Sequence, residues 1–226
     1  MTGISNITKF SALDYPDSLA TIIWFAGCNM RCSYCYNPDI VFSKGHLTEN
    51  DVFSFLKTRI GKLEGVVLSG GECTLYKDIE KFCREIKAMG FKIKIDTNGT
   101  RPNIIENLIN KNLIDYIALD YKAPKYKYKE ITKNNDFELF SKTLNFLIKN
   151  KFNFEVRTTV HTLLLSENDI EAIITDLESR KYHGTYFLQN FLNDTKTIGN
   201  IENQLFKIDL KRRSNLFKIE FRNFNI

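Results

Sequence analysis

The chain has 226 residues, of which 43% are apolar and 26% are charged. These fractions are ordinary for a soluble globular protein. The 32 basic and 27 acidic residues give a net charge of +5, which by itself is too small to indicate binding to nucleic acid or to a membrane. The length corresponds to one large domain or two small ones. A chain of this size buries roughly 70% of the surface that it exposes when unfolded, so it needs no disulfide bonds to fold.

The N-terminal residues lack the basic and apolar stretches of a secretory leader. The longest nearly apolar run, Leu19–Cys28, is about half of the roughly 20 residues that a membrane span needs. We therefore expect a cytoplasmic protein without a membrane partner. Five cysteines are an odd number for a disulfide framework. In a reducing compartment, clustered thiols are more often metal ligands or catalytic groups.

Short apolar runs alternate with helical patterns along the chain. Runs rich in β-branched and aromatic residues predict buried strands, and apolar residues at helical spacing predict helices. Helix ends are indicated by Thr48 with Asp51, by Ser166 and by Gly90. In chain order we expect a strand at 20–27, a helix at 47–61, a strand at 65–71, a helix at 78–90, a strand at 92–99, a helix at 101–112, a strand at 116–122, a helix at 137–150, a strand at 154–160, a helix at 166–179 and a strand at 185–191.

Six strands that alternate with helices predict an α/β fold with a parallel sheet and right-handed crossovers. Six units are too few for an eight-fold barrel but enough for a strongly curved, open (β/α)6 barrel, and a doubly wound sheet is the alternative. Either fold gathers functional residues at the carboxyl ends of the strands. We expect one core domain over residues 1–200 and a basic C-terminal extension over 201–226, with an edge strand near 216–223.

Three cysteines lie within eight residues, directly after the first predicted strand: Cys28, Cys32 and Cys35. Zinc would need a fourth ligand to complete a tetrahedral set, and Cys73 or His46 could supply it. An iron–sulfur cluster is bound by cysteine thiolates, usually four, so three would leave one iron open for a substrate. The sequence favours the iron–sulfur cluster over zinc and over structural thiols.

The spacing Cys-x3-Cys-x2-Cys, with Tyr34 before the last cysteine, resembles the radical S-adenosylmethionine (SAM) superfamily. The resemblance implies that the three thiolates hold a [4Fe-4S] cluster and that SAM chelates its fourth iron. It places Tyr34 near the adenine. It also places Gly70, Gly71 and Glu72 at the methionine amino group. Glycines allow a close backbone approach, and a carboxylate accepts hydrogen bonds from an ammonium.

Within that superfamily, the segment from residue 9 to residue 39 resembles the activating proteins of glycyl radical enzymes. It is similar in particular to the longer type of anaerobic ribonucleoside-triphosphate reductase activating protein. The similarity spans roughly residues 4–192. The matching motifs are Phe10-Ser11, Asp14-Tyr15-Pro16, Asn37-Pro38, Asp96-Thr97-Asn98-Gly99, Asp120-x-Lys122-Ala123-Pro124 and Arg157-Thr158-Thr159-Val160.

This resemblance implies a function and further site residues. Asp96, Asp120 and Lys122 would surround SAM, with the acids holding a monovalent cation against the methionine carboxylate and Lys122 binding that carboxylate. Flavodoxin or ferredoxin would reduce the cluster, and SAM would be cleaved to methionine and a 5′-deoxyadenosyl radical. That radical would remove a hydrogen atom from a glycine of the partner, anaerobic ribonucleotide reductase.

Three other functions stay open: a 7-carboxy-7-deazaguanine synthase, an activase of a pyruvate formate-lyase-type enzyme, and a zinc-binding interaction module. The chain also departs from the family pattern at two positions. Cys73 stands where proline usually follows Gly-Gly-Glu, and Tyr36 stands where histidine usually follows the third cysteine. We expect Cys73 to be a tolerated buried thiol. We expect Cys83 to lie on an amphipathic helix with its side chain in the protein core.

Lysines and tyrosines alternate between Tyr121 and Lys129. Such a run can bind nucleic acid by charge and stacking, but we expect a solvated loop before a helix and no nucleic-acid partner. His161 and His183 lie beside strands and are not expected to be ligands. Trp24, within the first strand, is expected to pack in the core.

Overall fold

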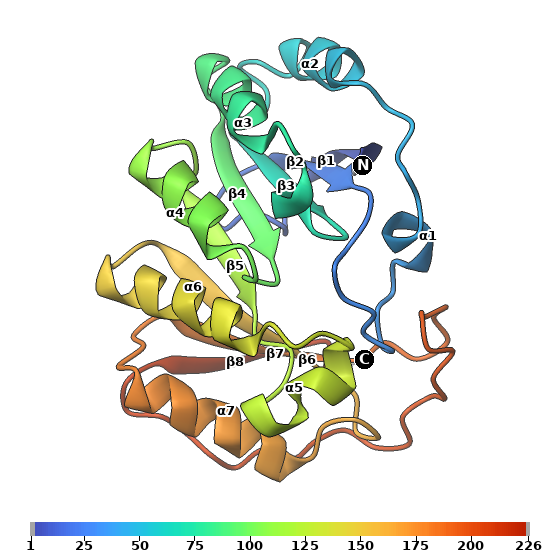
Figure 1. Cartoon of the computed structure of the whole chain (residues 1–226), viewed down its shortest axis with the longest axis vertical. Helices are drawn as coiled ribbons and strands as arrows, with labels where there is room; N and C mark the ends of the chain where they lie inside the picture. The colour runs from blue at the N-terminus through green and yellow to red at the C-terminus, as the bar shows by residue number, and fades with distance from the viewer. Residues whose placement is uncertain (1–2, 225–226) are drawn as a thin grey trace. The chain divides into compact units, whose positions relative to one another are not determined.

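The computed structural model describes residues 3–224 and shows an α/β chain (Figure 1). The chain divides into two compact units, and each contains strands that are parallel for the most part, with helices packed on them. The first consists of Met1–Asn29, Asp39–Thr97 and Arg101–Ala118, and the second of Met30–Pro38, Asn98–Thr100 and Leu119–Ile226.

The sheet of the first unit has the strand order β1-β2-β3-β4. Strand β1 (Ile4–Ser11) pairs antiparallel with β2 (Ala20–Phe25). Strand β3 (Gly65–Gly70) pairs parallel with β2, and β4 (Lys92–Thr97) pairs parallel with β3. Phe25 lies opposite Gly70, so β2 and β3 end level with each other. This shared end is where the sequence places Cys28 and Gly-Gly-Glu.

Helices cover this sheet (Figure 1). They are α2 (Glu49–Lys57), α3 (Ile79–Ala88) and α4 (Pro102–Asn110), with two short elements, α1 (Pro38–Val41) and the 3-10 turn Cys73–Leu75. Thr48 and Asp51 form the expected capping box of α2, and Pro102 occupies the first turn of α4. Gly90 follows α3 with φ +90°, as expected for a glycine that ends a helix.

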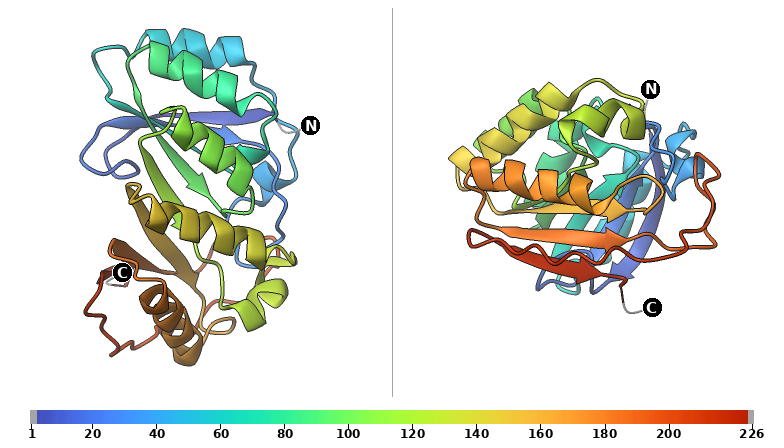
Figure 2. Two further views of the ribbon diagram at one scale, coloured as in Figure 1. Left: turned by 60° about the vertical axis from the view of Figure 1, so that its left-hand side comes forward. Right: turned by 90° about the horizontal axis from the view of Figure 1, so that it is seen from below.

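The second unit has three parallel strands in the order β6-β7-β8. They are β6 (Phe154–Val160), β7 (Thr185–Asn190) and β8 (Lys218–Arg222). Strand β5 (Tyr116–Asp120) begins in the first unit and ends in the second. Helices α6 (Phe137–Lys149) and α7 (Glu167–Ser179) lie on one side of β6–β8 (Figure 2), and α5 (Lys125–Thr132) precedes them.

The expected alternation of strands and helices is confirmed, as is the parallel α/β class. Two strands lie outside that alternation. β1 was not predicted, because its side chains are mostly half-exposed and show no buried apolar face. The edge strand expected near 216–223 is present as β8, at residues 218–222. It joins β7 in parallel through an irregular segment, 191–217, that contains no helix in the described chain.

The interpretation of residues 121–129 as a solvated loop is wrong. Residues 125–132 form helix α5, and both Tyr121 and Tyr128 are only 1% exposed. Buried tyrosine rings cannot stack on bases, so Tyr121 and Tyr128 cannot serve as stacking platforms, and only Tyr126 of this run is exposed. Two of the positive charges are also paired, since Lys127 contacts Asp169 and Lys125 contacts Glu138.

No helix in the described part of the chain is both long and apolar enough to cross a membrane.

Asp169 joins α7 to α5 and generates a testable pH dependence. Its carboxylate accepts hydrogen bonds from the Ser166 backbone at 2.8 Å, the Tyr126 hydroxyl at 2.7 Å and the Lys127 ammonium at 3.0 Å. Burial works to raise the pKa of Asp169, but these hydrogen bonds outweigh it and lower the pKa to about 2. The stabilisation is therefore fully present above the unfolded pKa near 3.8 and is lost as the pH falls toward 2.

We predict that Asp169→Asn lowers the free energy of unfolding at pH 7 by about 2 kcal/mol. Urea unfolding between pH 7 and pH 2 should show the two proteins converging as the pH falls. Asp51→Asn is the matched control, since Asp51 occupies the same capping position but, among the described residues, hydrogen-bonds with Thr48 alone. A loss from Asp169→Asn no larger than that from Asp51→Asn would contradict this assignment.

Candidate functional site

Gly70 and Gly71 end β3, where the backbone passes very close to the segment after β2. A Cβ atom on Gly71 would lie 2.0 Å from the Gly27 carbonyl oxygen, and one on Gly70 would lie 2.3 Å from the Phe25 oxygen. Gly70 also has φ +125°, which side chains rarely allow. The Cβ atom added to Gly71 would also lie 3.2 Å from the Cys28 Cβ. The glycine pair therefore lets β3 approach the backbone that leads into Cys28.

Glu72 is 1% exposed, and its carboxylate is held by threonines. Its Oε1 atom accepts hydrogen bonds from the Thr74 backbone at 3.1 Å, the Thr74 hydroxyl at 2.6 Å and the Thr97 hydroxyl at 2.8 Å. The Glu72 backbone N–H donates to the Gly27 carbonyl at 2.9 Å. Glu72 thus ties the ends of β2, β3 and β4 together and holds a buried carboxylate in one orientation.

Asp96 lies near the end of β4 with two polar partners from its own unit. The Lys94 ammonium lies 2.5 Å from Oδ1, and the Ser69 hydroxyl donates to Oδ2 at 3.0 Å. Cys73 is fully buried beside this pair, and its thiol donates to the Asp96 carbonyl at 3.5 Å. Burial raises the pKa of the Cys73 thiol well above its usual value, so Cys73 is the neutral buried thiol that was expected.

In the second unit, backbone hydrogen bonds fix residues 31–35 of the cysteine loop to α5 and to the segment 198–199. The Cys35 backbone N–H donates to the Cys32 carbonyl at 3.1 Å, which makes a tight turn between these two thiols. The Arg31 N–H donates to the Thr132 carbonyl at the end of α5. The segment 198–199 donates to the carbonyls of Ser33 and Cys35.

The five cysteines are thiols, and those of the loop differ in burial. Cys32 is buried, whereas Cys28 and Cys35 are half-buried. Burial raises the pKa of the Cys32 thiol to about 11, although the nearby Lys122 charge opposes the shift. Because metal-bound cysteine is a thiolate, cluster binding would release the Cys32 proton.

The aromatic residues of the loop have different surroundings. Tyr34 is 4% exposed, and its hydroxyl has no hydrogen-bond partner within residues 3–224. Tyr36 replaces the usual histidine; its hydroxyl accepts from the Leu192 N–H at 2.7 Å, and its ring stacks on Phe191 with centroids 5.1 Å apart. Tyr36 therefore fastens the loop to the segment after β7, and Tyr34 carries a buried polar atom without a hydrogen-bond partner among residues 3–224.

Asp120 and Lys122 follow β5 and contact each other in the second unit. The Lys122 ammonium lies 3.0 Å from Asp120 Oδ2, and the Arg157 guanidinium contacts Oδ1 at 3.0 Å through Nε and Nη2. Burial works to lower the pKa of Lys122, but the Asp120 charge and hydrogen bond, together with Tyr34 and Cys32, outweigh it and raise the pKa well above its usual value. Lys122 is therefore a cation suited to binding a carboxylate.

Sequence reasoning missed Lys94 and assigned no role to Arg157. Lys94 lies inside an apolar strand pattern, between Ile93 and Ile95, and a charged residue at such a position indicates a buried partner. Arg157 was noted only as part of a motif, although it lies on β6 and reaches Asp120. No sequence signal indicated the contacts of Ser33 with Gly199.

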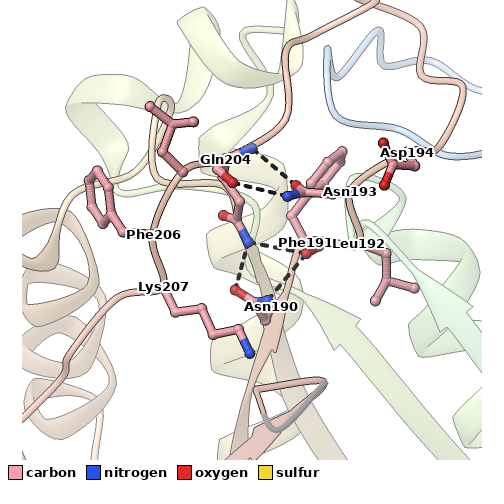
Figure 3. Close-up of a pocket in the computed structure, with 9 residues that line it drawn as sticks. Asn190, Phe191, Leu192, Asn193, Asp194, Gln204, Phe206 and Lys207 are labelled. Carbon is pink, nitrogen blue, oxygen red and sulfur yellow. Dashed lines mark hydrogen bonds between the residues drawn. The ribbon is translucent and has the colours of Figure 1, made fainter.

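A pocket of about 400 Å³ opens at the carboxyl end of β7 (Figure 3). The Gln204 amide donates to Asn190 Oδ1 at 2.8 Å and to the Phe191 carbonyl at 3.1 Å, and its oxygen accepts from the Thr162 N–H at 3.2 Å. The Gln204 backbone pairs with the Asn193 amide in both directions. These bonds fasten the chain after residue 200 to the end of β7.

Within residues 3–224, no three cysteine, histidine or acidic side chains already form a set that could hold a metal ion. The residues nevertheless fit a thiolate-bound cluster with SAM. Three thiols come from one short loop, Gly71 leaves room beside Cys28, and the Tyr34 hydroxyl is buried with an unmet hydrogen bond.

A parallel α/β fold with a three-cysteine loop after its first parallel strand defines the class of this protein. The family model for the radical SAM superfamily matches residues 22–177, and the chain belongs to this superfamily. It is therefore an enzyme, and its family uses a [4Fe-4S] cluster and SAM.

Several known proteins are similar to the chain. It is 39% identical over 177 residues to a candidate glycyl-radical enzyme activating enzyme of Methanocaldococcus jannaschii, covering 75% of this chain and 73% of that one. It is 30% identical to 7-carboxy-7-deazaguanine synthase of Clostridium acetobutylicum, over 55% of this chain and 56% of the relative. It is 34% identical to pyruvate formate-lyase-activating enzyme of Clostridium pasteurianum, over 54% of this chain and 53% of the relative.

Solved structures show the same fold. Streptococcus suis SuiB matches with a TM-score of 0.65 at 14% identity, covering 88% of this chain and 47% of SuiB. SuiB bound to S-adenosylmethionine matches with a TM-score of 0.64 at 15% identity, covering 78% of this chain and 41% of SuiB. The chain thus spans less than half the length of these SuiB structures.

We predict that Gly71→Ala lowers the free energy of unfolding by at least about 2 kcal/mol, because the new methyl group would overlap a backbone oxygen that cannot move aside. Gly61→Ala is the matched control. Gly61 has φ +72° with no atom within 4 Å of an added Cβ. The free energy of unfolding of Gly61→Ala should therefore fall only by the cost of backbone strain, about 1 kcal/mol. Urea unfolding measures both, and equal losses would contradict the close contact.

We predict that Gln204→Ala lowers the free energy of unfolding by about 2 kcal/mol or more, because it leaves the buried Asn190 side chain and the half-buried Thr162 N–H without their partner. The neighbouring Asn203→Ala is the control, since the Asn203 amide is exposed and bonds Asp194 at the surface. We expect the control to cost less than about 1 kcal/mol in the same urea titration. A Gln204→Ala protein as stable as Asn203→Ala would contradict the role of Gln204 in anchoring the C-terminal segment.

Proposed function

We propose that this radical SAM enzyme is a glycyl-radical enzyme activating enzyme whose partner is anaerobic ribonucleoside-triphosphate reductase. The observation that carries the activating function is the 39% identity, over three quarters of the chain, to the candidate activating enzyme of M. jannaschii. The choice of the reductase as partner rests on the leader and strand-end motifs of the sequence. The leader takes part in the fold, since the Tyr15 ring covers Gly65 at the start of β3.

In this proposal Cys28, Cys32 and Cys35 are the ligands of the [4Fe-4S] cluster and the catalytic thiolates. The donor set supports it, because thiolates are the ligands of such clusters and three of them leave one iron available. Tyr34 lies between the second and third ligands, and its buried hydroxyl is suited to donate to the SAM adenosine.

The remaining proposed SAM contacts come from the strand ends. Gly70, Gly71 and Glu72 would hold the methionine amino group, with the Glu72 carboxylate already oriented by its threonine partners. Lys122 would bind the methionine carboxylate. Asp96 and Asp120 would line the site as charged groups that are paired within the protein.

When bound, the cluster and SAM supply the 5′-deoxyadenosyl radical that removes a hydrogen atom from the partner glycine. The protein's task is to bind and orient, since a hydrogen-atom transfer requires no acid–base pair. A glycine Cα hydrogen is a favourable target because the resulting radical is delocalised over both flanking amides.

We further propose flavodoxin or ferredoxin as the reductant, a cytoplasmic location, and an open (β/α)6 barrel for the radical SAM core of residues 1–200. Residues 201–226 would form an extension of that core. Its anchoring through Gln204 and β8 supports a segment that packs on the core. Residues 225–226 lie outside the described chain.

The cluster assignment is tested by anaerobic reconstitution with iron and sulfide. The wild-type protein should turn brown and bind about four irons per chain, and Cys28→Ala, Cys32→Ala and Cys35→Ala should each abolish this. Cys83→Ala is the control, because Cys83 is buried in α3 and should not affect iron content. A colourless protein that binds one zinc would instead identify the zinc-binding module.

The activating function is tested by mixing the reduced protein and SAM with an anaerobic ribonucleoside-triphosphate reductase. Electron paramagnetic resonance should show the doublet of a glycyl radical, and a reductase with its radical glycine changed to alanine should show none. A doublet that forms only on a pyruvate formate-lyase-type enzyme would reassign the partner. SAM cleavage without a doublet on either enzyme would favour a synthase like 7-carboxy-7-deazaguanine synthase, to which the chain is 30% identical.

A further inference from the structure

Asp96 is already paired with a buried ammonium group. The Lys94 ammonium lies 2.5 Å from Asp96 Oδ1, and the side chains of Lys94 and Asp96 are only 3% and 14% exposed. The Ser69 hydroxyl donates a hydrogen bond to the second carboxylate oxygen, Oδ2, at 3.0 Å. Lysine is almost never this deeply buried unless its charge is paired. This ion pair is therefore a built feature of the β3–β4 sheet.

Strand geometry explains how the pair forms. Residues two apart on a strand point to the same face, so Lys94 and Asp96 lie side by side on β4. Ser69 lies on the neighbouring strand β3 and completes the set. The pair is thus held by the sheet and does not depend on a loop for its position.

Asp120 in the second unit shows the same compensation. It contacts the Lys122 ammonium two residues along the chain and the Arg157 guanidinium on β6. Counting formal charges, Asp96 with Lys94 sums to zero, and Asp120 with Lys122 and Arg157 sums to +1. Each of these two acids thus has at least one basic partner that offsets its charge, whereas Glu72, the other acid beside Cys73, is held by Thr74 and Thr97.

The resemblance to activating enzymes implies a monovalent cation held by these acids, and the residues present do not fit it. A cation bound at Asp96 Oδ1 would sit within a few ångströms of the Lys94 ammonium, in a site with little water to screen the two positive charges. The Asp96 charge that would attract a hard cation is already offset by the ammonium group, which weakens the binding of such a cation.

We propose that the Lys94 ammonium is the built-in counter-ion of Asp96 and takes the place of a monovalent cation, so that the protein requires neither Na⁺ nor K⁺ at this site. The expected effect of cations on SAM binding, which is part of the test below, rests on the proposed function. The pairing of Lys94 with Asp96 and its effect on cation binding do not.

The test compares the purified protein in potassium, sodium and choline chloride at equal ionic strength. For the wild type we expect superimposable thermal unfolding curves, no broadening of the sodium NMR line, and one SAM dissociation constant in all three salts. Lys94→Met keeps the length of the side chain but removes its charge, leaving Asp96 uncompensated. This variant should be stabilised by potassium or sodium over choline.

Lys94→Met should also bind SAM about fivefold more tightly in 100 mM potassium than in choline, which is the linkage expected if the cation dissociation constant is about 100 mM in the SAM-free variant and about 10 mM in its SAM complex. Lys92→Met is the matched control, since Lys92 lies on the same strand but is exposed. It should behave as the wild type. The double variant Lys94→Met/Asp96→Asn removes both charges and should be indifferent to the cation.

Saturable stabilisation of the wild type by potassium or sodium over choline would overturn the proposal. So would a folded Lys94→Met protein without a new cation response. If Lys94→Met fails to fold, the salt comparison of the wild type and of the double variant still tests the proposal. Failure of SAM to bind in every salt would count against the proposed function, while the unfolding and NMR measurements on the SAM-free protein would still test the counter-ion.

Discussion

The close contact between Gly71 and the Gly27 carbonyl is the constraint on which the strand ends of the first unit depend. It brings the end of β3 against the segment that leads from β2 to Cys28, and an added methyl group would overlap a backbone oxygen at 2.0 Å. The Glu72 N–H then bonds that same carbonyl, and the Glu72 carboxylate reaches Thr97 on β4. One close backbone approach thereby sets the positions of a proposed cluster ligand and a proposed SAM contact.

Three acids that are buried or half-buried have a basic partner from their own unit. Asp96 is paired with Lys94, Asp120 with Lys122 and Arg157, and Asp169 with Lys127. Removing one partner of such a pair leaves an uncompensated buried charge, which costs several kcal/mol. The acids at the strand ends are thus fixed in place before any ligand is present, which is the preorganisation that a binding site needs.

The loop of the second unit is organised by contacts with distant segments of the chain. Ser33 and Cys35 accept hydrogen bonds from residues 198–199, and Tyr36 packs on Phe191. The segment 191–217 has no helix and no regular pattern, yet it supplies these contacts, the Gln204 network and the link to β8. It therefore links the C-terminal region of the chain to the cysteine loop.

The sequence alone determined the alternation of strands and helices, the capping residues of α2 and α7, and the radical SAM family, because these depend on local patterns and on motif spacing. It could not reveal β1, which lacks a buried face, or helix α5, in which Tyr128 is buried against Phe137 and Phe140. Strand alternation places Lys94 beside Asp96 on β4, so that pair depends on the local sequence. Only the tertiary structure decided that Arg157 on β6 reaches Asp120, because these residues are far apart in the chain and are brought together by how the strands pack.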